Sequence, residues 1–306
     1  MNFKQMAKRV FLFVLVNLLV MTTISIVLSL AGAYLHIPRG GLTGLVVMCF
    51  FWGFGGAFIS LAMSRMMAKW FMGVQVIPPD TSDPEGRELV RIVHGLAQQA
   101  RLPEMPQVGI YDSPEVNAFA TGPSKSRSLV AVSTGLLHSM SRPEIEGVLG
   151  HEVTHIANGD MVTMTLIQGV INALVLLLAR LLAFVVGQAL RSRDDRDSGG
   201  GWIQFLLVQV FQIVFSILGS LVVCWFSRQR EFRADAGGAR LAGRENMIDA
   251  LHALGRLHDP EIAAAEAGHA QSFQSLKISG QGGFLALLST HPPLEERIAR
   301  LEQVTR

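Results

Sequence analysis

The sequence contains little charge and almost no cysteine. Aspartate, glutamate, lysine and arginine make up 16% of its 306 residues, well below the quarter or so that is usual in soluble domains. Its two cysteines, Cys49 and Cys224, both lie within apolar runs, so neither a disulfide framework nor a thiolate metal site is indicated. The net charge of +2 is too small to indicate nucleic-acid binding, and we expect no nucleic-acid partner.

The sequence instead contains several long apolar runs. Half of the residues are apolar and the mean hydropathy is +0.37. The first run, Val10 to Ala33, carries no formal charge; at 1.5 Å per residue it reaches roughly 36 Å, enough to cross a bilayer core of about 30 Å. It is also longer than the apolar core of a cleaved signal peptide, which is the alternative interpretation. We predict four transmembrane helices in two hairpins, 1–70 and 161–226, with spans at about 10–33, 42–64, 161–190 and 202–226.

Basic residues at the ends of these runs predict their orientation. Lysines and arginines favour the cytoplasmic side, and they precede the first run, follow the second at Arg65 and Lys69, and follow the fourth at residues 228–233. The turn at 191–201 also carries three arginines, which weakly contradicts this topology and leaves open whether the second hairpin fully spans the bilayer. The two polar parts, 77–160 and 227–306, would then share the cytoplasmic face and fold together as one domain.

The polar parts show helix and strand patterns. Asp83-Pro84-Glu85 indicates the start of a helix, because proline suits the first helical turn. The segments QVGIYD and SLVAVS are typical of strands, and NAFATG between them fits a strand or a loop. The fold class predicted is a mainly α membrane protein with a cytoplasmic α+β domain that contains a small sheet.

The segment SRPEIEGVLGHEVTHIANGD, residues 141–160, has the pattern of a metal-binding helix. Ser141 and Glu144 form a capping box, so a helix begins at about residue 142. His151 and His155 are four residues apart and lie on one helix face, where two imidazoles can hold one cation. Glu152 is offset by about 100°, where a general base for a zinc-bound water is needed. The alternative is a pair of solvated histidines, but the apolar residues before the motif favour a packed helix.

A catalytic zinc site needs a third protein ligand, and the segment SRQREFRADAGGA after the fourth run offers one. Glu231 would complete a set of two histidines and a glutamate, and Asp235, one turn later, can accept a hydrogen bond from a ligating histidine. The alternative is that both acids pair with neighbouring arginines on a solvated helix. If the second pair of spans forms a hairpin, however, both motifs return to the same membrane face.

These motifs resemble the HtpX-type membrane zinc metalloproteases of the M48 metallopeptidase family. The similarity covers nearly the whole chain and includes NAFATG, GHEVTHIANGD, SRQREFRADAGGA and THPPLEERI. The resemblance implies a zincin-like domain, one zinc ion per chain held by His151, His155 and Glu231, and Glu152 as the base. It also implies a stress-response role at the bacterial inner membrane: quality control of misfolded membrane proteins, in cooperation with a membrane ATP-dependent protease.

Other residues have possible supporting roles, each with a simpler alternative. His291 in the THP segment could donate to the oxyanion or be merely solvated. Arg297 could contact substrate, hold its segment in place or lie on the surface. Asn117 could bind the substrate backbone or suit a local turn, and Ser128–Ser133 could be an edge strand for substrate or a core strand. Asp160 could simply end the helix before the membrane.

The function predicted is that of a membrane-embedded zinc endopeptidase, in which zinc-bound water attacks the peptide bond with help from Glu152. Its substrates would be misfolded or damaged membrane proteins, and the lipid bilayer is its second partner. The alternative is a zinc-binding membrane scaffold without activity, which would not need Glu152. A metal transporter is disfavoured, because the four predicted spans contain no histidine or carboxylate.

Overall fold

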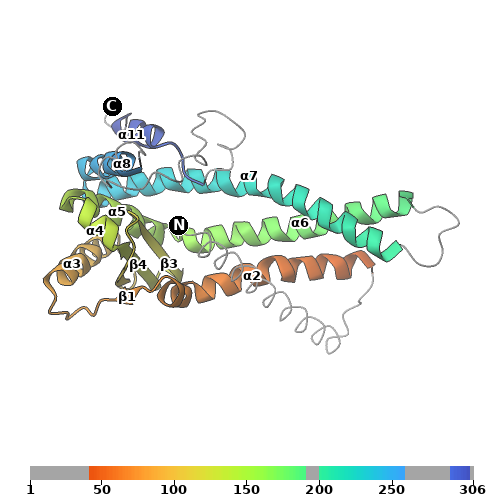
Figure 1. Cartoon of the computed structure of the whole chain (residues 1–306), viewed down its shortest axis with the longest axis horizontal. Helices are drawn as coiled ribbons and strands as arrows, with labels where there is room; N and C mark the ends of the chain where they lie inside the picture. Colours follow the sequence, from red (N-terminus) through yellow and green to blue (C-terminus); the bar gives the residue numbers. More distant parts are fainter. Residues whose placement is uncertain (1–40, 191–199, 259–289, 304–306) are drawn as a thin grey trace, which may run out of the picture. The chain divides into compact units, whose positions relative to one another are not determined.

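The computed structural model describes residues 41–190, 200–258 and 290–303 (Figure 1). The predicted span at 10–33 and most of the polar turn after residue 190 lie outside the described residues. The described residues divide into two compact units, one from the ranges 41–60 and 165–223, the other from the ranges 61–164 and 224–303. Three long helices, α2 (Gly41–Phe71), α6 (Asp160–Leu190) and α7 (Gly200–Ala242), contribute to both units.

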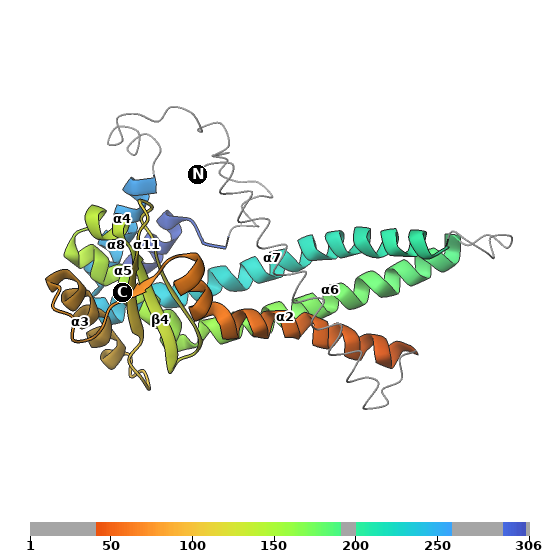
Figure 2. The ribbon, with the colours of Figure 1, turned by 60° about the horizontal axis from the view of Figure 1, so that its bottom comes forward.

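Within the described residues, three helices are long and apolar enough to cross a membrane, and they correspond to three of the four predicted spans. Large apolar side chains on their surfaces are exposed, as expected of helices that face lipid. Glycines let the helices of this unit approach closely: a Cβ atom at Gly53 of α2 would lie 2.4 Å from the Ala173 backbone of α6, and one at Gly219 of α7 would lie 2.6 Å from Ile171. Figure 2 shows α6 and α7 running alongside one another.

The second unit contains a four-stranded sheet of order β1-β2-β4-β3. β2 and β4 are parallel, whereas β1 and β3 pair antiparallel with their neighbours. The predicted strands are confirmed, and NAFATG belongs mostly to a strand rather than a loop. The strands are β1 (Gln75–Val76), β2 (Gln107–Tyr111), β3 (Ala118–Ser124) and β4 (Arg127–Ser133).

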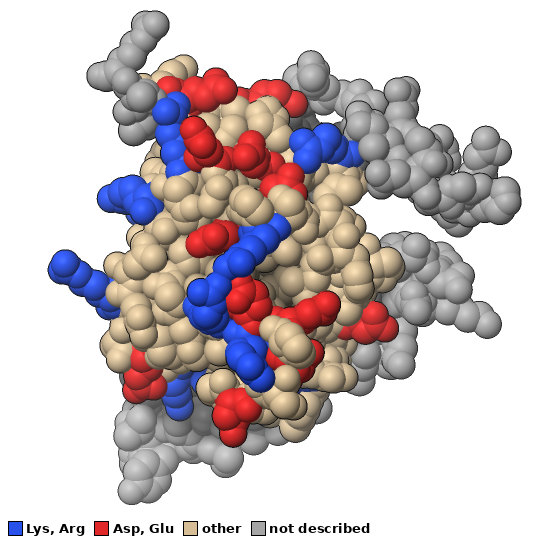
Figure 3. All heavy atoms as spheres, turned by 90° about the vertical axis from the view of Figure 1, so that its left-hand side faces the viewer, with Lys and Arg blue, Asp and Glu red and all other residues tan. Residues whose placement is uncertain are grey.

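Alternation along β4 creates a core on each face of this sheet. Val130 and Val132 pack with α3 and α5, whereas Leu129 and Ala131 pack on the opposite face with Ala68 from the end of α2. The face in Figure 3 carries basic and acidic side chains side by side, as at a surface that faces water. The helices of this unit are α3 (Pro84–Gln99), α4 (Thr134–Ser139), α5 (Arg142–Asn158), α8 (Arg244–His258) and α11 (Leu294–Gln303).

The helix starts agree with the sequence signals. Asp83 caps α3 by accepting a hydrogen bond from Gly86, and Ser141 with Glu144 forms the predicted capping box of α5. Burial by itself raises the pKa of Glu144, but hydrogen bonds from Ser141 and Arg256 outweigh it, so the pKa lies below its usual value. Local sequence therefore determines where these helices begin.

The sheet order decides between the two alternatives for Ser128–Ser133. Ser128–Ser133 is not an edge strand, because β4 is hydrogen-bonded to β2 on one side and to β3 on the other. The edge beside it is β3, which contains most of NAFATG. The predicted fourth span and the SRQREFRADAGGA segment that follows it belong to one uninterrupted helix of 43 residues, α7.

Candidate metal centre

α5 carries both histidines and the candidate base into the interior of the second unit. Leu149, Val153 and Ile156 on this helix are fully buried, which fixes the helix against the core. His151 and His155 are themselves buried, at 7% and 9% exposure. The alternative of a solvated histidine pair is therefore wrong.

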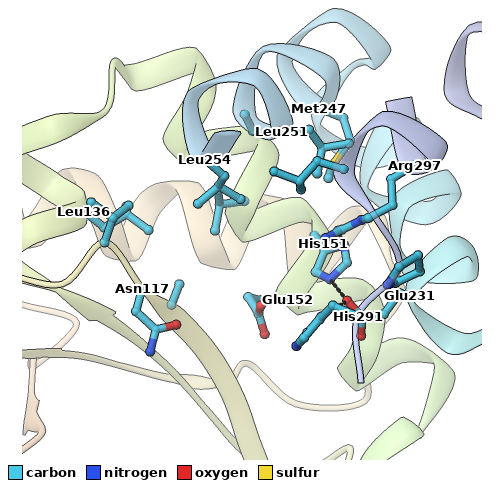
Figure 4. A pocket seen from close by; sticks show the side chains of 16 residues that line it. Asn117, Leu136, His151, Glu152, Glu231, Met247, Leu251, Leu254, His291 and Arg297 are labelled. Carbon is cyan, nitrogen blue, oxygen red and sulfur yellow. Dashed lines mark hydrogen bonds and ion pairs between the residues drawn. The ribbon is translucent and has the colours of Figure 1, made fainter. Parts of the chain in front are cut away.

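Glu231 of α7 completes a compact group with these histidines (Figure 4). The Nε2 atoms of His151 and His155 are 3.1 Å apart, and the carboxylate oxygens of Glu231 lie 3.5 Å and 3.4 Å from them. Ligand atoms at 2.0–2.2 Å from a tetrahedral zinc ion lie roughly 3.3–3.6 Å from one another. The three side chains therefore have the spacing and the chemistry of a zinc site.

The surroundings of Glu231 also fit a cation. Its side chain is 1% exposed, and its Oε1 atom makes no hydrogen bond within the described part of the chain. A buried carboxylate oxygen without a donor is costly unless a positive charge compensates it. Arg230 Nε lies 3.6 Å from this atom, beyond hydrogen-bond distance, and a divalent cation between Glu231 and the two imidazoles would provide closer compensation.

Each candidate histidine ligand is oriented by a second carboxylate. His151 Nδ1 donates to Asp235 at 2.9 Å, as predicted, and His155 Nδ1 donates to Asp160 at 2.7 Å. Protons on both Nδ1 atoms leave the Nε2 lone pairs for a cation. Burial by itself lowers the pKa of both imidazoles, but contacts with carboxylates outweigh it. Asp235 and Glu231 raise the pKa of His151, and Asp160 and Glu231 raise the pKa of His155 to about 9. The site thus favours positive charge.

The role of Asp160 was missed from the sequence. In a continuous helix, residues five apart point about 140° away from each other, so residue 160 would not face His155. Gly159 adopts a left-handed conformation, with φ of 72°, and ends α5; Asp160 then begins α6 and points back to the histidine. An acid directly after a helix-ending glycine was the available signal.

Arg297 is largely buried against Asp235 and also lines the pocket beside the metal site. Its Nε and Nη2 atoms donate to the two oxygens of Asp235 at 2.8 Å and 2.6 Å, and the arginine is 7% exposed. This geometry favours the interpretation that Arg297 holds its segment in place. The chain of contacts links α11 through Asp235 to His151. The alternative of a solvated helix is wrong, because Glu231 and Asp235 are both buried, although Arg230 Nε does lie 3.6 Å from Glu231 Oε1.

Close backbone packing allows α7 to bring its acids to α5. A Cβ atom at Gly238 would lie 2.9 Å from the backbone nitrogen of His151, and one at Gly237 would lie 2.2 Å from Thr154. Side chains at these positions would push the two helices apart. The two glycines of SRQREFRADAGGA are therefore structural parts of the site that the sequence did not assign.

A pocket of about 450 Å³ opens beside the three candidate ligands. Glu152 is half-buried and points into it, between Asn117 on one side and His151 with Glu231 on the other (Figure 4). His291 lies at the pocket too, and its Nδ1 donates to Glu231 at 2.9 Å. Apolar side chains form much of the wall; they include Leu136, Val148, Met247, Leu251 and Leu254.

Comparison with known proteins agrees with this site. The profile described as Peptidase family M48 matches residues 84–305. The chain belongs to peptidase family M48. As a member, it is a metallopeptidase; the family is zinc-dependent in general, and the described part of the chain holds a His-His-Glu group suited to that ion.

Relatives extend the match to nearly the whole chain. A Protease HtpX homolog of Bacillus velezensis is 51% identical over 97% of this chain and 99% of its own length. Protease HtpX of Tolumonas auensis is 49% identical over 97% of this chain and 99% of its own. These relatives and the apolar helices together indicate a membrane protease that acts on protein substrates.

The crystal structure of S. mikatae Ste24p has the same fold. Its TM-score is 0.63 at 16% identity, and the match covers 98% of this chain. The chain spans 66% of the length of that larger protein.

Proposed function

We propose that this M48 peptidase is a zinc-dependent endopeptidase whose zinc is held by His151, His155 and Glu231 and whose general base is Glu152. The observation that carries the proposal is the convergence of three buried ligand atoms, all within 4.8 Å of one another, beside a pocket into which a further carboxylate points. A structural zinc site would have four protein ligands and no open pocket beside it.

A zinc ion held by His151, His155 and Glu231 would supply Lewis-acid chemistry, which lowers the pKa of water and polarises a carbonyl. Glu152 accepts a proton from the attacking water on its carboxylate and then donates it to the nitrogen of the leaving amine. Asp235 and Asp160 keep the protons of His151 and His155 on Nδ1 throughout. His291, at the mouth of the pocket, is placed to donate to the developing oxyanion.

The substrate would lie extended beside β3. This strand is an edge of the described sheet, so its outer backbone groups are available to a further strand. Asn117, directly before β3, lies at the pocket and supports a role in binding the substrate backbone. The apolar wall formed by α4, α5 and α8 suits an apolar side chain, which unfolded segments expose and folded proteins bury.

We assign the enzyme to the quality control of misfolded or damaged membrane proteins at the bacterial inner membrane. The apolar helices support a membrane location, and the names of the HtpX relatives support proteolysis there. Arg65 and Lys69 at the end of α2 favour a cytoplasmic position for the polar unit. Cooperation with a membrane ATP-dependent protease is part of the same proposal.

Glu152→Gln in the full chain tests the proposal. The variant should bind zinc as wild type does but cleave an unfolded or membrane-tethered substrate more slowly, by roughly 10²–10⁴-fold. Glu146→Gln, on the same helix but outside the pocket, is the matched control and should cleave normally.

Two outcomes would decide against this mechanism. Cleavage at the normal rate by Glu152→Gln would remove Glu152 as the base. Stoichiometric zinc with no cleavage by the wild type would instead support the alternative of a non-catalytic zinc-binding scaffold.

A further inference from the structure

A second pocket, of about 350 Å³, lies away from the metal centre and has a basic lining. It is formed by one face of the last turns of α2 and by the β3–β4 hairpin. Its cationic residues are Arg65 and Lys69 of α2 and Arg127 at the start of β4. The remaining lining residues are Ala62, Met66, Trp70 and Pro123. Nothing in the proposed proteolytic mechanism uses this pocket.

The three cations have no acidic partner within the described chain. Elsewhere on the surface, Arg91 pairs with Glu88 and Arg300 pairs with Glu296, whereas the guanidinium of Arg87 donates to backbone carbonyls. In contrast, no carboxylate of a described residue forms an ion pair with Arg65, Lys69 or Arg127. Three positive charges gathered around one hollow repel one another unless an anion binds between them.

The position of the pocket along α2 indicates where that anion comes from. The candidate membrane span Gly44–Phe71 ends here, and Trp70 and Phe71 are 74% and 58% exposed. Exposed aromatic rings and basic residues at the end of a span are typical of the membrane–water interface. The pocket therefore opens at the level where phospholipid headgroups lie.

The lining matches both parts of a phospholipid headgroup region. Two guanidinium groups and one ammonium suit a phosphodiester, since arginine binds phosphate oxygens in a bidentate fashion and lysine acts as a point charge. The apolar atoms of Met66, Trp70 and Pro123 suit the glycerol and upper acyl region. We propose that this pocket binds the headgroup of an anionic glycerophospholipid and so anchors the β3–β4 hairpin to the bilayer surface.

The test is a titration of the full chain, held in neutral detergent micelles, with lipid, and binding is measured by thermophoresis. Phosphatidylglycerol is the probe and zwitterionic phosphatidylcholine is the reference. Each cation near an anionic lipid contributes about fivefold in affinity, so Arg65→Gln/Lys69→Gln/Arg127→Gln should weaken phosphatidylglycerol binding on the order of a hundredfold. The matched control, Arg87→Gln/Arg91→Gln/Arg240→Gln, removes the same charge from exposed positions and should change binding by less than about twofold.

A single-residue variant and two alternative ligands complete the test of lipid binding. If the triple variant does not fold, as judged by circular dichroism, Lys69→Gln alone should still weaken binding about fivefold. Equal losses in the triple variant and its control would show non-specific attraction and overturn the proposal, as would unchanged binding in both. The lipid proposal would also fail if phosphatidylglycerol did not bind this pocket but inorganic phosphate or a glutamate-rich peptide did, because the occupant would then be a different anion.

Discussion

Replacement of Arg297 by methionine should disturb both the fold and the metal site. Arg297 and Asp235 form a bidentate pair in which the two side chains are 8% and 2% exposed, and Asp235 also accepts from His151. Without the guanidinium, the Asp235 charge stays buried with only the histidine as a partner. Loss of one member of a buried ion pair costs about 3–5 kcal/mol, and loss of support for a ligand weakens metal binding by about 10- to 100-fold.

Both effects can be measured on the full chain in detergent. Denaturant or thermal unfolding of the zinc-loaded protein gives the change in stability, and competition with a chromogenic chelator gives the zinc affinity. Arg300→Met on the same helix is the control: its ion pair with Glu296 is half-exposed and its guanidinium stacks on Phe232, which together contribute on the order of 1 kcal/mol. That variant should leave zinc affinity unchanged.

The double variant Arg297→Met/Asp235→Asn separates the charge effect from simple loss of packing. It leaves no unpaired charge, so it should unfold with a smaller loss of stability than Arg297→Met alone, although its zinc affinity stays low. The reasoning would be refuted if Arg297→Met resembled Arg300→Met in both assays, because the buried pair would then contribute no more than a surface one.

Three further predictions concern other parts of the site. Asp160→Asn should weaken zinc binding by about 10- to 100-fold in the chelator assay, because His155 loses its anionic partner; an unchanged affinity would contradict this role. Gly238→Ala should lower stability by about 1–3 kcal/mol and reduce zinc content, because the new methyl group meets the α5 backbone, whereas Gly95→Ala, with open space around it, should not destabilise. The pKa of Glu144 is lowered in the folded state, so its ionised carboxylate stabilises the fold at pH values above the unfolded-state pKa. This stabilisation is lost as the pH falls through the folded-state pKa. Glu144→Gln should therefore lose less stability than wild type on acidification from about pH 6.

Features encoded within one turn of helix or one strand could be predicted from the sequence. The capping box at Ser141, the cap at Asp83 and the spacing of His151 and His155 depend only on residues close along the chain, and all three appear as expected. The apolar runs likewise predict long helices from composition, and the three that fall on described residues are helical.

Features that depend on neighbours distant in the sequence could not be derived in the same way. Whether SLVAVS is an edge or a central strand depends on which strands pair with it, and β2 lies on the side that the sequence did not reveal. Arg297 lies 62 residues after Asp235. Its charge alone is compatible with a position on the surface, a contact with substrate or a buried pairing in the core. Only packing of α11 against α8 decides among them.

The sequence by itself determined which side chains can bind a cation and move a proton, because two histidines and a glutamate on one helix turn are a local arrangement. Tertiary structure decided that Glu231 reaches them, that Asp160 and Asp235 orient them, and that Arg297 neutralises the second of these acids. The physical reason is that a buried charge is tolerated only where a partner of opposite sign or a donor lies within about 3 Å, and the chain supplies those partners from four separate helices.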